Sequence, residues 1–232
     1  MSKLFGTDGV RGLANQDLKP ELAFRLGRAA GTLLKKTEGT SSLLIGRDTR
    51  LSGSMLEASL AAGICSAGVN VYAAGVIPTP AVAYLTRTMD FQAGAVISAS
   101  HNPAPDNGIK FFNHQGFKLA DELEERIEEL LATDLDKLPR PLGAEIGQVI
   151  PFAEGRERYA NFLAGSVQGR FEGCKIVLDC ANGAAYEVAP QIFRQLGAQV
   201  ISLKDLPDGK NINDSCGSTH PEFLQLAVKK YH

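Results

Sequence analysis

The sequence predicts an α/β protein, and two observations support this prediction. Short apolar runs of strand length alternate with longer segments in which apolar residues recur at helical spacing. Several of the apolar runs also end in small or polar residues and lead directly into a helical segment, which is the order of a β-α-β unit. Such units place parallel strands in a sheet with helices packed against it.

The first 152 residues are expected to form one domain. Its strands are expected at residues 42–46, 70–74, 93–98 and 109–112, with a turn at 106–108 and an edge strand within 144–150. Its helices are expected at residues 19–36, 55–67, 79–87 and 121–132. Either Ser52 or Ser54 is expected to cap the second of these helices.

Residues 153–232 are expected to form a second domain. The pattern predicts helices at 155–163, 185–196 and 221–230, and strands at 175–179 and 199–203. Two strands and three helices are too few to cover both faces and both edges of a parallel sheet. We therefore expect this second domain to be truncated.

Composition excludes several classes of protein. The 232 residues carry a net charge of −2, which does not suggest a surface for nucleic acid or membrane. No apolar run reaches the roughly 18 residues that span a bilayer, and the N-terminus lacks the apolar core of a signal peptide. The four cysteines show no C-x-x-C spacing, which argues against a zinc site or disulfide framework. Reduced thiols and a cytoplasmic location fit best.

The most informative stretch follows the strand expected at 93–98 and reads Ser98-Ala99-Ser100-His101-Asn102-Pro103. Open α/β sheets place their chemistry at the carboxyl ends of strands. Successive residues on an extended backbone point in opposite directions, so His101 is not automatically the base for Ser100. A Ser-His-Asp hydrolase usually has a G-x-S-x-G elbow, which is missing. Ser100 among cations suits phosphoryl transfer better, with Ser98 as the rival nucleophile; alternatively, these residues only form a turn.

Three cations are candidates for binding a phosphate. Arg11 lies in FGTDGVRG at residues 5–12, where three glycines in eight residues indicate close backbone approach. Arg47 follows a strand and precedes a helix. Together with Arg50 it either helps to bind an anion or belongs to a segment in which Asp48 merely pairs with one of the two arginines. Lys110 is flanked by apolar residues; it is either a partly desolvated proton shuttle or a surface lysine on an edge strand.

Together these motifs resemble those of the α-D-phosphohexomutases. The run from Ser98 to Pro103, with DNGIK at 106–110 behind it, looks like the phosphoserine loop of that family. FGTDGVRG at 5–12 and NINDSCGSTH at 211–220 resemble the branch formed by the phosphoglucosamine mutases. The resemblance implies mixed-sheet, three-layer α/β/α domains, one complete and a second truncated, within a four-domain protein about twice as long as these 232 residues.

The resemblance also implies roles for individual residues. The catalytic candidates are Ser100, His101, Lys110 and Arg11, and the phosphate-binding candidates are Arg47 and Asn102. Ser100 corresponds to the phosphorylated nucleophile and Lys110 to a general acid or base. One Mg²⁺ is implied, bound through the Ser100 phosphate and the carboxylates of a D-x-D-x-D-R motif. That motif is missing, so we expect the metal carboxylates to lie beyond this chain.

The implied activity interconverts glucosamine 6-phosphate and glucosamine 1-phosphate through a glucosamine 1,6-bisphosphate, in UDP-N-acetylglucosamine biosynthesis. The implied partners are a phosphosugar substrate and a second copy of the chain in a homodimer. Two alternatives remain open. The chain either belongs to a phosphomannomutase or phosphoglucomutase of the same family, or is a non-catalytic fragment. In either case we expect no meaningful turnover from these 232 residues alone.

Overall fold

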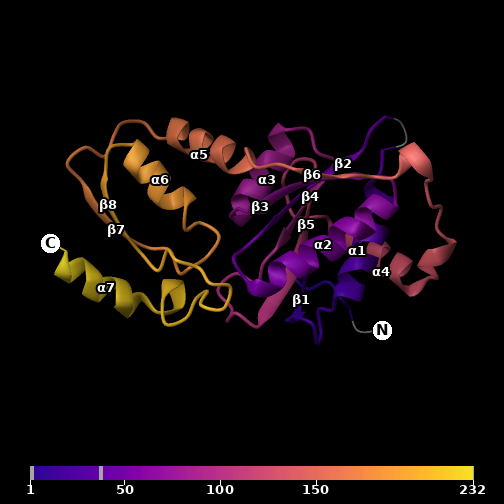
Figure 1. The fold of residues 1–232 in the computed structure, drawn as a ribbon, viewed down its shortest axis with the longest axis horizontal. Helices are drawn as coiled ribbons and strands as arrows, with labels where there is room; N and C mark the ends of the chain where they lie inside the picture. The colour runs from indigo at the N-terminus through magenta and orange to yellow at the C-terminus, as the bar shows by residue number, and fades with distance from the viewer. Residues whose placement is uncertain (1–2, 37–38, 232) are drawn as a thin grey trace.

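The computed structural model describes residues 3–36 and 39–231, and their strands form two sheets (Figure 1). The larger sheet has six strands in the order β1-β5-β4-β2-β3-β6. They are β1 (Val10–Leu13), β2 (Ser42–Arg47), β3 (Asn70–Val76), β4 (Ala93–Ile97), β5 (Asp106–Asn113) and β6 (Val149–Pro151). The smaller sheet pairs β7 (Lys175–Asp179) with β8 (Gln199–Leu203).

The helices follow the predicted order closely. They are α1 (Pro20–Leu34), α2 (Leu51–Ser66), α3 (Thr79–Thr88), α4 (Asp121–Ala132), α5 (Gly155–Ser166), α6 (Val188–Gln195) and α7 (Pro221–Lys230). Short 3-10 turns lie at Leu135–Lys137, Gly143–Glu145 and Gly217–Thr219. None of the helices described is long and apolar enough to span a membrane.

The larger sheet is mixed, which confirms the predicted fold class. Strands β4, β2, β3 and β6 run parallel, whereas β5 is antiparallel to both β4 and β1. The register places Lys110 opposite Val96, and Ile109 opposite Val10. The N-terminal segment is therefore laid along β5 as an extra strand, so that Arg11 lies within the sheet.

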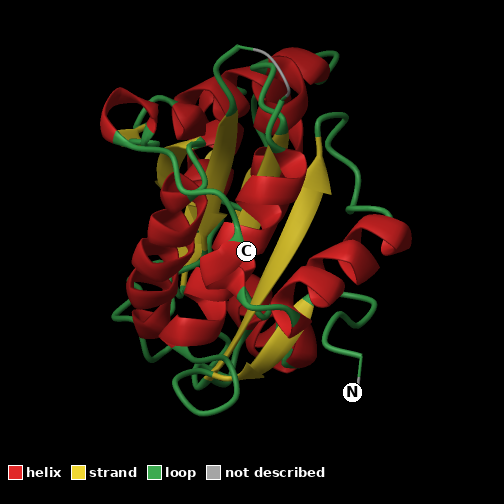
Figure 2. Ribbon diagram, turned by 90° about the vertical axis from the view of Figure 1, so that its right-hand side faces the viewer, coloured by secondary structure: helices red, strands yellow, loops and turns green. Residues whose placement is uncertain are grey.

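Helices cover both faces of this sheet (Figure 2). Side chains alternate between the faces of a strand. In β2, Leu43 and Ile45 pack with α1 and α2, whereas Leu44 packs with α3 on the opposite face. All three are fully buried, and each contributes roughly 1.5–3 kcal/mol to folding by leaving water. The apolar runs of the sequence thus form strands that are buried on both sides.

Two local predictions were wrong. Residues 106–108 were expected to be a turn, but they open β5, because the chain has already reversed between Ser100 and Pro105. The expected serine cap of α2 is also absent among the described hydrogen bonds, because the helix begins earlier, at Leu51. Ser52 therefore lies in the first turn, and its Oγ accepts a hydrogen bond of 2.9 Å from Nδ2 of Asn107 on β5.

The second part of the chain forms the predicted β-α-β unit. Strands β7 and β8 are parallel and α6 connects them. Helix α5 packs against both α6 and α3, so it joins this unit to the larger sheet (Figure 1). The predicted edge strand is present as β6, which pairs with β3 alone in the sheet as described. We propose that the boundary between two domains lies just after it, near residue 152.

Candidate active site

The carboxyl end of β4, the start of α3, strand β5 and the N-terminal segment converge on one small cavity. It has a volume of about 240 Å³. Its lining consists of Asp8, Arg11, Thr79, Val96, Ser98, Ser100, His101 and Lys110. The structure thus brings together four of the predicted site residues, namely Ser100, His101, Lys110 and Arg11. They come from three separate segments of the sequence, which the antiparallel pairing of β5 with β1 and β4 makes neighbours.

Ser100 stands at the tip of the turn that follows β4. It is exposed, and its backbone has a φ of +54°, in the left-handed region. This conformation costs a residue other than glycine on the order of 1–3 kcal/mol, so the surroundings must hold it. The Ser100 N–H donates to Oγ of Ser98 at 3.0 Å. The Ser100 carbonyl oxygen accepts hydrogen bonds from the side chains of Arg50 and Asn213. The result is a hydroxyl that the turn presents to the cavity.

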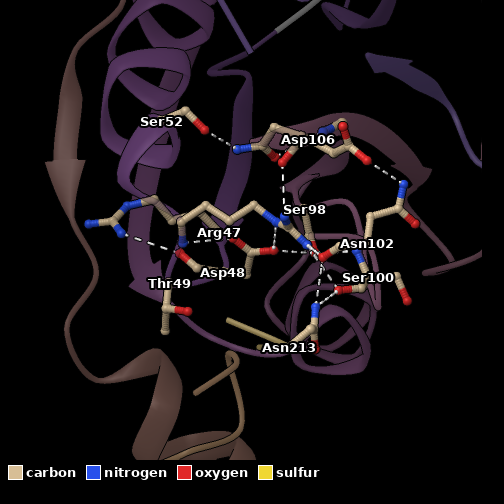
Figure 3. Close-up of polar contacts among 12 residues, drawn as sticks. Arg47, Asp48, Thr49, Ser52, Ser98, Ser100, Asn102, Asp106 and Asn213 are labelled. Carbon is tan, nitrogen blue, oxygen red and sulfur yellow. Dashed lines mark hydrogen bonds and ion pairs between the residues drawn. The ribbon is translucent and has the colours of Figure 1, made fainter. Parts of the chain in front are cut away.

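The rival nucleophile, Ser98, has its hydroxyl occupied. Ser98 Oγ donates to Oδ2 of Asp48 at 2.7 Å and accepts the N–H of Ser100 (Figure 3). Asp48 is buried, with 3% of its side chain exposed. A hydroxyl bound on both sides in this way serves to shape the turn. The geometry therefore favours Ser100 as the nucleophile.

A fully buried arginine, Arg50, holds this turn from below. Its Nε lies 2.9 Å from Oδ2 of Asp48, and both side chains are shielded from water. Its two terminal nitrogens donate to four carbonyl oxygens of the turn, those of Ser100, Asn102, Pro103 and Asp106. Arginine suits this task because its planar fork carries five N–H donors. The guanidinium thereby fixes the course of the backbone around Ser100.

A second ionic group lies on the other side of the cavity. Nζ of Lys110 lies 2.7 Å from Oδ1 of Asp8, and Nη2 of Arg11 lies 3.5 Å from Oδ2 of the same carboxylate. The hydrogen bond from Lys110 and the charges of both cations hold the pKa of the Asp8 carboxyl below its ordinary value. Two cations share one carboxylate, so this wall of the cavity keeps a net positive charge that suits a phosphate.

His101 lies beside the nucleophile without a close hydrogen bond to it. Its Nδ1 is 3.5 Å from Oγ of Ser100, which is at the limit for a hydrogen bond. Both residues are exposed. The imidazole is therefore a polar neighbour in the same cavity, as the sequence suggested, and its assignment to catalysis remains a prediction.

The two predicted phosphate-binding residues lie outside the cavity lining of the described chain. Nε of Arg47 pairs at 2.8 Å with Oε2 of Glu57 on α2. Nδ2 of Asn102 donates to Oδ2 of Asp106 at 2.9 Å. This bond closes the turn at residues 98–106, which we call the serine turn. Their predicted roles are not tested by this geometry, but Asp48 does pair with one arginine, and that arginine is Arg50.

Sequence reasoning missed four residues that shape this site. Asp8 stands in the glycine-rich octet beside Arg11, where a carboxylate next to a predicted phosphate ligand is a usable signal. Arg50 was visible in the segment RDTR, but only the fold shows that it is buried. Thr79 lines the cavity from the first turn of α3. Asn213 contacts the serine turn from the second part of the chain, and its place in the motif at 211–220 was the usable signal.

A divalent metal ion would need several oxygen ligands at this site. Within residues 3–36 and 39–231, no group of three or more His, Cys, Asp or Glu side chains is arranged to hold a metal ion. The carboxylate of the cavity, Asp8, is already paired with two cations. The described residues therefore do not form a complete Mg²⁺ site by themselves.

Comparison with known proteins places these features in a family context. Residues 2–137 match the family model described as phosphoglucomutase/phosphomannomutase, alpha/beta/alpha domain I. The chain is 59% identical over 228 residues to a phosphoglucosamine mutase of Desulforudis audaxviator, covering 98% of this chain and 51% of that protein. It is 56% identical over 230 residues to a phosphoglucosamine mutase of Desulforamulus reducens, covering 99% and 52%.

A solved structure shows the same fold. A phosphoglucomutase/phosphomannomutase family protein from Burkholderia thailandensis superposes with a TM-score of 0.80 at 26% identity, covering 99% of this chain and 50% of that one. The chain thus spans about half the length of the curated relatives and of the solved structure that it matches.

Proposed function

Because the chain belongs to the phosphoglucomutase/phosphomannomutase family, we propose that it supplies the phosphoryl-carrying half of a phosphoglucosamine mutase. The reaction is the interconversion of glucosamine 6-phosphate and glucosamine 1-phosphate. Its product would feed UDP-N-acetylglucosamine biosynthesis. Support for glucosamine phosphates over other sugars comes from relatives with 56–59% identity that carry the name phosphoglucosamine mutase.

The observation that carries this proposal is the position of Ser100. Its hydroxyl stands in a cavity with the ammonium of Lys110 and the guanidinium of Arg11, whereas the hydroxyl of Ser98 is occupied. A phosphate on Ser100 would place a charge of about −2 in this cavity. Two cations on the facing wall, held by one carboxylate, would offset that charge.

The transfer itself follows from these groups. The bond between phosphorus and Oγ of Ser100 breaks, and a bond forms between phosphorus and the free hydroxyl oxygen of the sugar. The sugar hydroxyl loses its proton and Oγ of Ser100 gains one, so the first transfer yields glucosamine 1,6-bisphosphate and unmodified serine. We assign Lys110 to this proton exchange. After the sugar turns over, Ser100 takes back the phosphate from the other end.

A divalent metal belongs to the proposal as well. Mg²⁺ would supply charge neutralisation for the transferring oxygens when bound. The Ser100 phosphate would be the ligand that the described residues provide. The described residues lack the carboxylates for a complete site, so we propose that these come from elsewhere in the protein.

Two further properties extend the proposal. We place the enzyme in the cytoplasm, where its phosphosugar substrates are made, and we propose a homodimer as its assembly. Neither nucleic acid nor membrane is proposed as a partner, in keeping with the net charge of −2.

The experiment that tests the function compares substrates. The natural-length gene product is assayed with the 6-phosphates of glucosamine, glucose and mannose at equal concentrations. We expect glucosamine 6-phosphate to give the highest kcat/KM. A preference for glucose or mannose phosphate would identify a phosphoglucomutase or phosphomannomutase instead. The 232-residue chain is assayed in parallel, and a rate from it near that of the natural-length protein would contradict the proposal that half of the site lies elsewhere.

A further inference from the structure

One side chain from the second part of the chain contacts the serine turn directly. Asn213 follows β8, and its Nδ2 donates at 2.9 Å to the carbonyl oxygen of Ser100 and at 2.9 Å to that of Asn102 (Figure 3). Both partners are acceptors only, so the amide nitrogen and not the amide oxygen must face the turn. The orientation of the side chain is thereby determined by chemistry.

The same two carbonyl oxygens also bind Arg50. Its Nη2 lies 3.1 Å from the oxygen of Ser100 and 2.8 Å from that of Asn102. A carbonyl oxygen has two lone pairs. Each of these oxygens thus receives one donor from the loop between β2 and α2 and one from the second part of the chain. Arg50 alone would leave one lone pair of each oxygen without a protein donor.

Asn213 is itself held firmly. Its backbone has a φ of +60°, and its N–H donates at 2.9 Å to the carbonyl oxygen of Ala181, in the loop after β7. The buried side chain of Asn182 ties that loop to the next one, since it binds the N–H of Leu206 and the carbonyl oxygen of Asn211. The two loops therefore form one cross-linked unit.

This unit also touches the loop that carries Arg50. The hydroxyl of Thr49 donates to the carbonyl oxygen of Asn182, and the N–H of Leu51 donates at 2.9 Å to that of Gly209. The contacts lie immediately on either side of Arg50 in the sequence. Both donors to the serine turn thus belong to one interface between the larger sheet and the β7–β8 unit.

We propose that Asn213 is a positioning residue for phosphoryl transfer, an inference that rests on the proposed function. By binding the carbonyl oxygens of Ser100 and Asn102, it keeps Ser100 in its left-handed backbone conformation, in which the serine turn presents the Ser100 hydroxyl to the cavity. It also makes that turn depend on where the β7–β8 unit lies. Asn213 does not line the cavity as described, so it acts through the backbone of the turn.

The test uses two substitutions that tolerate a positive φ but lack the amide donor, Asn213→Asp and Asn213→Gly. The first also sets a carboxylate oxygen against two carbonyl oxygens. The matched control is Asn211→Asp, because the Nδ2 of Asn211 donates to the carbonyl oxygen of Leu206 within its own loop. The first readout is hydrogen exchange of the Ser100 and Asn102 amides, both hydrogen-bonded within the turn.

We expect exchange at these two amides to become about ten-fold faster in both Asn213 variants and to stay at the wild-type rate in N211D. Unchanged exchange in N213D, or equally fast exchange in N211D, would overturn the inference. The second readout is the mutase rate of the natural-length gene product. We expect kcat to fall about ten-fold or more while KM changes little; faster exchange with an unchanged kcat would also overturn it.

Failure of the proposed function has a different signature. It would appear as a wild-type gene product without mutase activity on any of the three sugars. The exchange comparison between N213D and N211D would then still decide whether Asn213 holds the turn. The two failures are therefore distinguishable.

Discussion

Nζ of Lys110 lies 2.7 Å from Oδ1 of Asp8, across a distance of 102 residues in the sequence. The antiparallel pairing of β1 with β5 makes this contact possible, because it brings residue 109 opposite residue 10. The carboxylate orients the ammonium group at the wall of the cavity that contains Ser100. In this arrangement the N-terminal segment is part of the candidate active site.

The ion pair predicts how stability depends on pH. Hydrogen bonding to Lys110 lowers the pKa of Asp8 below its ordinary value of 3.8. The folded-state pKa is thus below that of the unfolded chain, so the carboxylate stabilises the fold above pH 3.8 and loses this effect as the pH falls through the lower value. Asp8 is about half exposed, so we expect D8N to cost less than about 1 kcal/mol at pH 7. Urea unfolding should show this difference shrinking as the pH falls below 3.8, and a constant difference across the range would contradict it.

Removal of the Lys110 ammonium should affect the reaction more than the fold. In the natural-length gene product, we expect K110M to lower kcat by about 10²- to 10⁴-fold, the range for loss of a general acid or base. The melting temperature should stay near that of the wild type. The matched control is K3M, which removes an exposed lysine that pairs with Glu125 on α4. A K110M enzyme as active as K3M would exclude Lys110 from proton transfer.

The two arginines after β2 should differ in their effect on folding. R50M leaves the buried Asp48 without its cation and removes one donor from each of four carbonyl oxygens, which should cost about 3–5 kcal/mol. R47M breaks a partly exposed pair with Glu57 and should cost only about 1 kcal/mol. Denaturant unfolding of both variants measures the difference. An equal or larger loss for R47M would contradict the assigned role of Arg50.

The cysteines offer a check on burial in the second part of the chain. Burial, with help from Asp205 and Asp179, raises the pKa of the Cys180 thiol to about 11, whereas Cys174 is exposed. At pH 8 the Cys180 thiol is almost wholly protonated and unreactive. We expect iodoacetamide to label Cys174 of the native protein first, with Cys180 labelled only after unfolding. Peptide mapping identifies the labelled cysteine. Labelling of Cys180 before Cys174 would contradict the burial of the Cys180 thiol in the loop after β7.

Local sequence patterns were sufficient for most elements of the fold. The runs SLLIG and KIVLD were predicted as buried strands and form β2 and β7, and the helix predicted at 121–132 is α4 without a shift. Residues 10–13 were not predicted as a strand. Their pairing with β5 depends on a partner about 100 residues away, which periodicity within a short window cannot reveal.

The candidate site, like the fold, could be predicted from the sequence only in part. Ser100, His101, Lys110 and Arg11 were predicted from short motifs and lie together, because each motif follows or flanks a strand. Arg47 was chosen because of the resemblance to the family, although Arg50 stands in the same polar segment. Only tertiary structure decides which guanidinium is buried. Asn213 contacts the turn from 113 residues away. It lies in the motif NINDSCGSTH at 211–220, which indicated the family but not this contact.

The most direct test of the account is the location of phosphate on the protein. Ser98 and Ser100 both lie in the tryptic peptide formed by residues 88–110 of the natural-length gene product, and fragmentation in a mass spectrometer distinguishes them. We predict phosphate on Ser100 in the wild type and in S98A, and none on this peptide in S100A. Phosphate on Ser98, or mutase activity that persists in S100A, would contradict the claim that Ser100 carries the phosphoryl group.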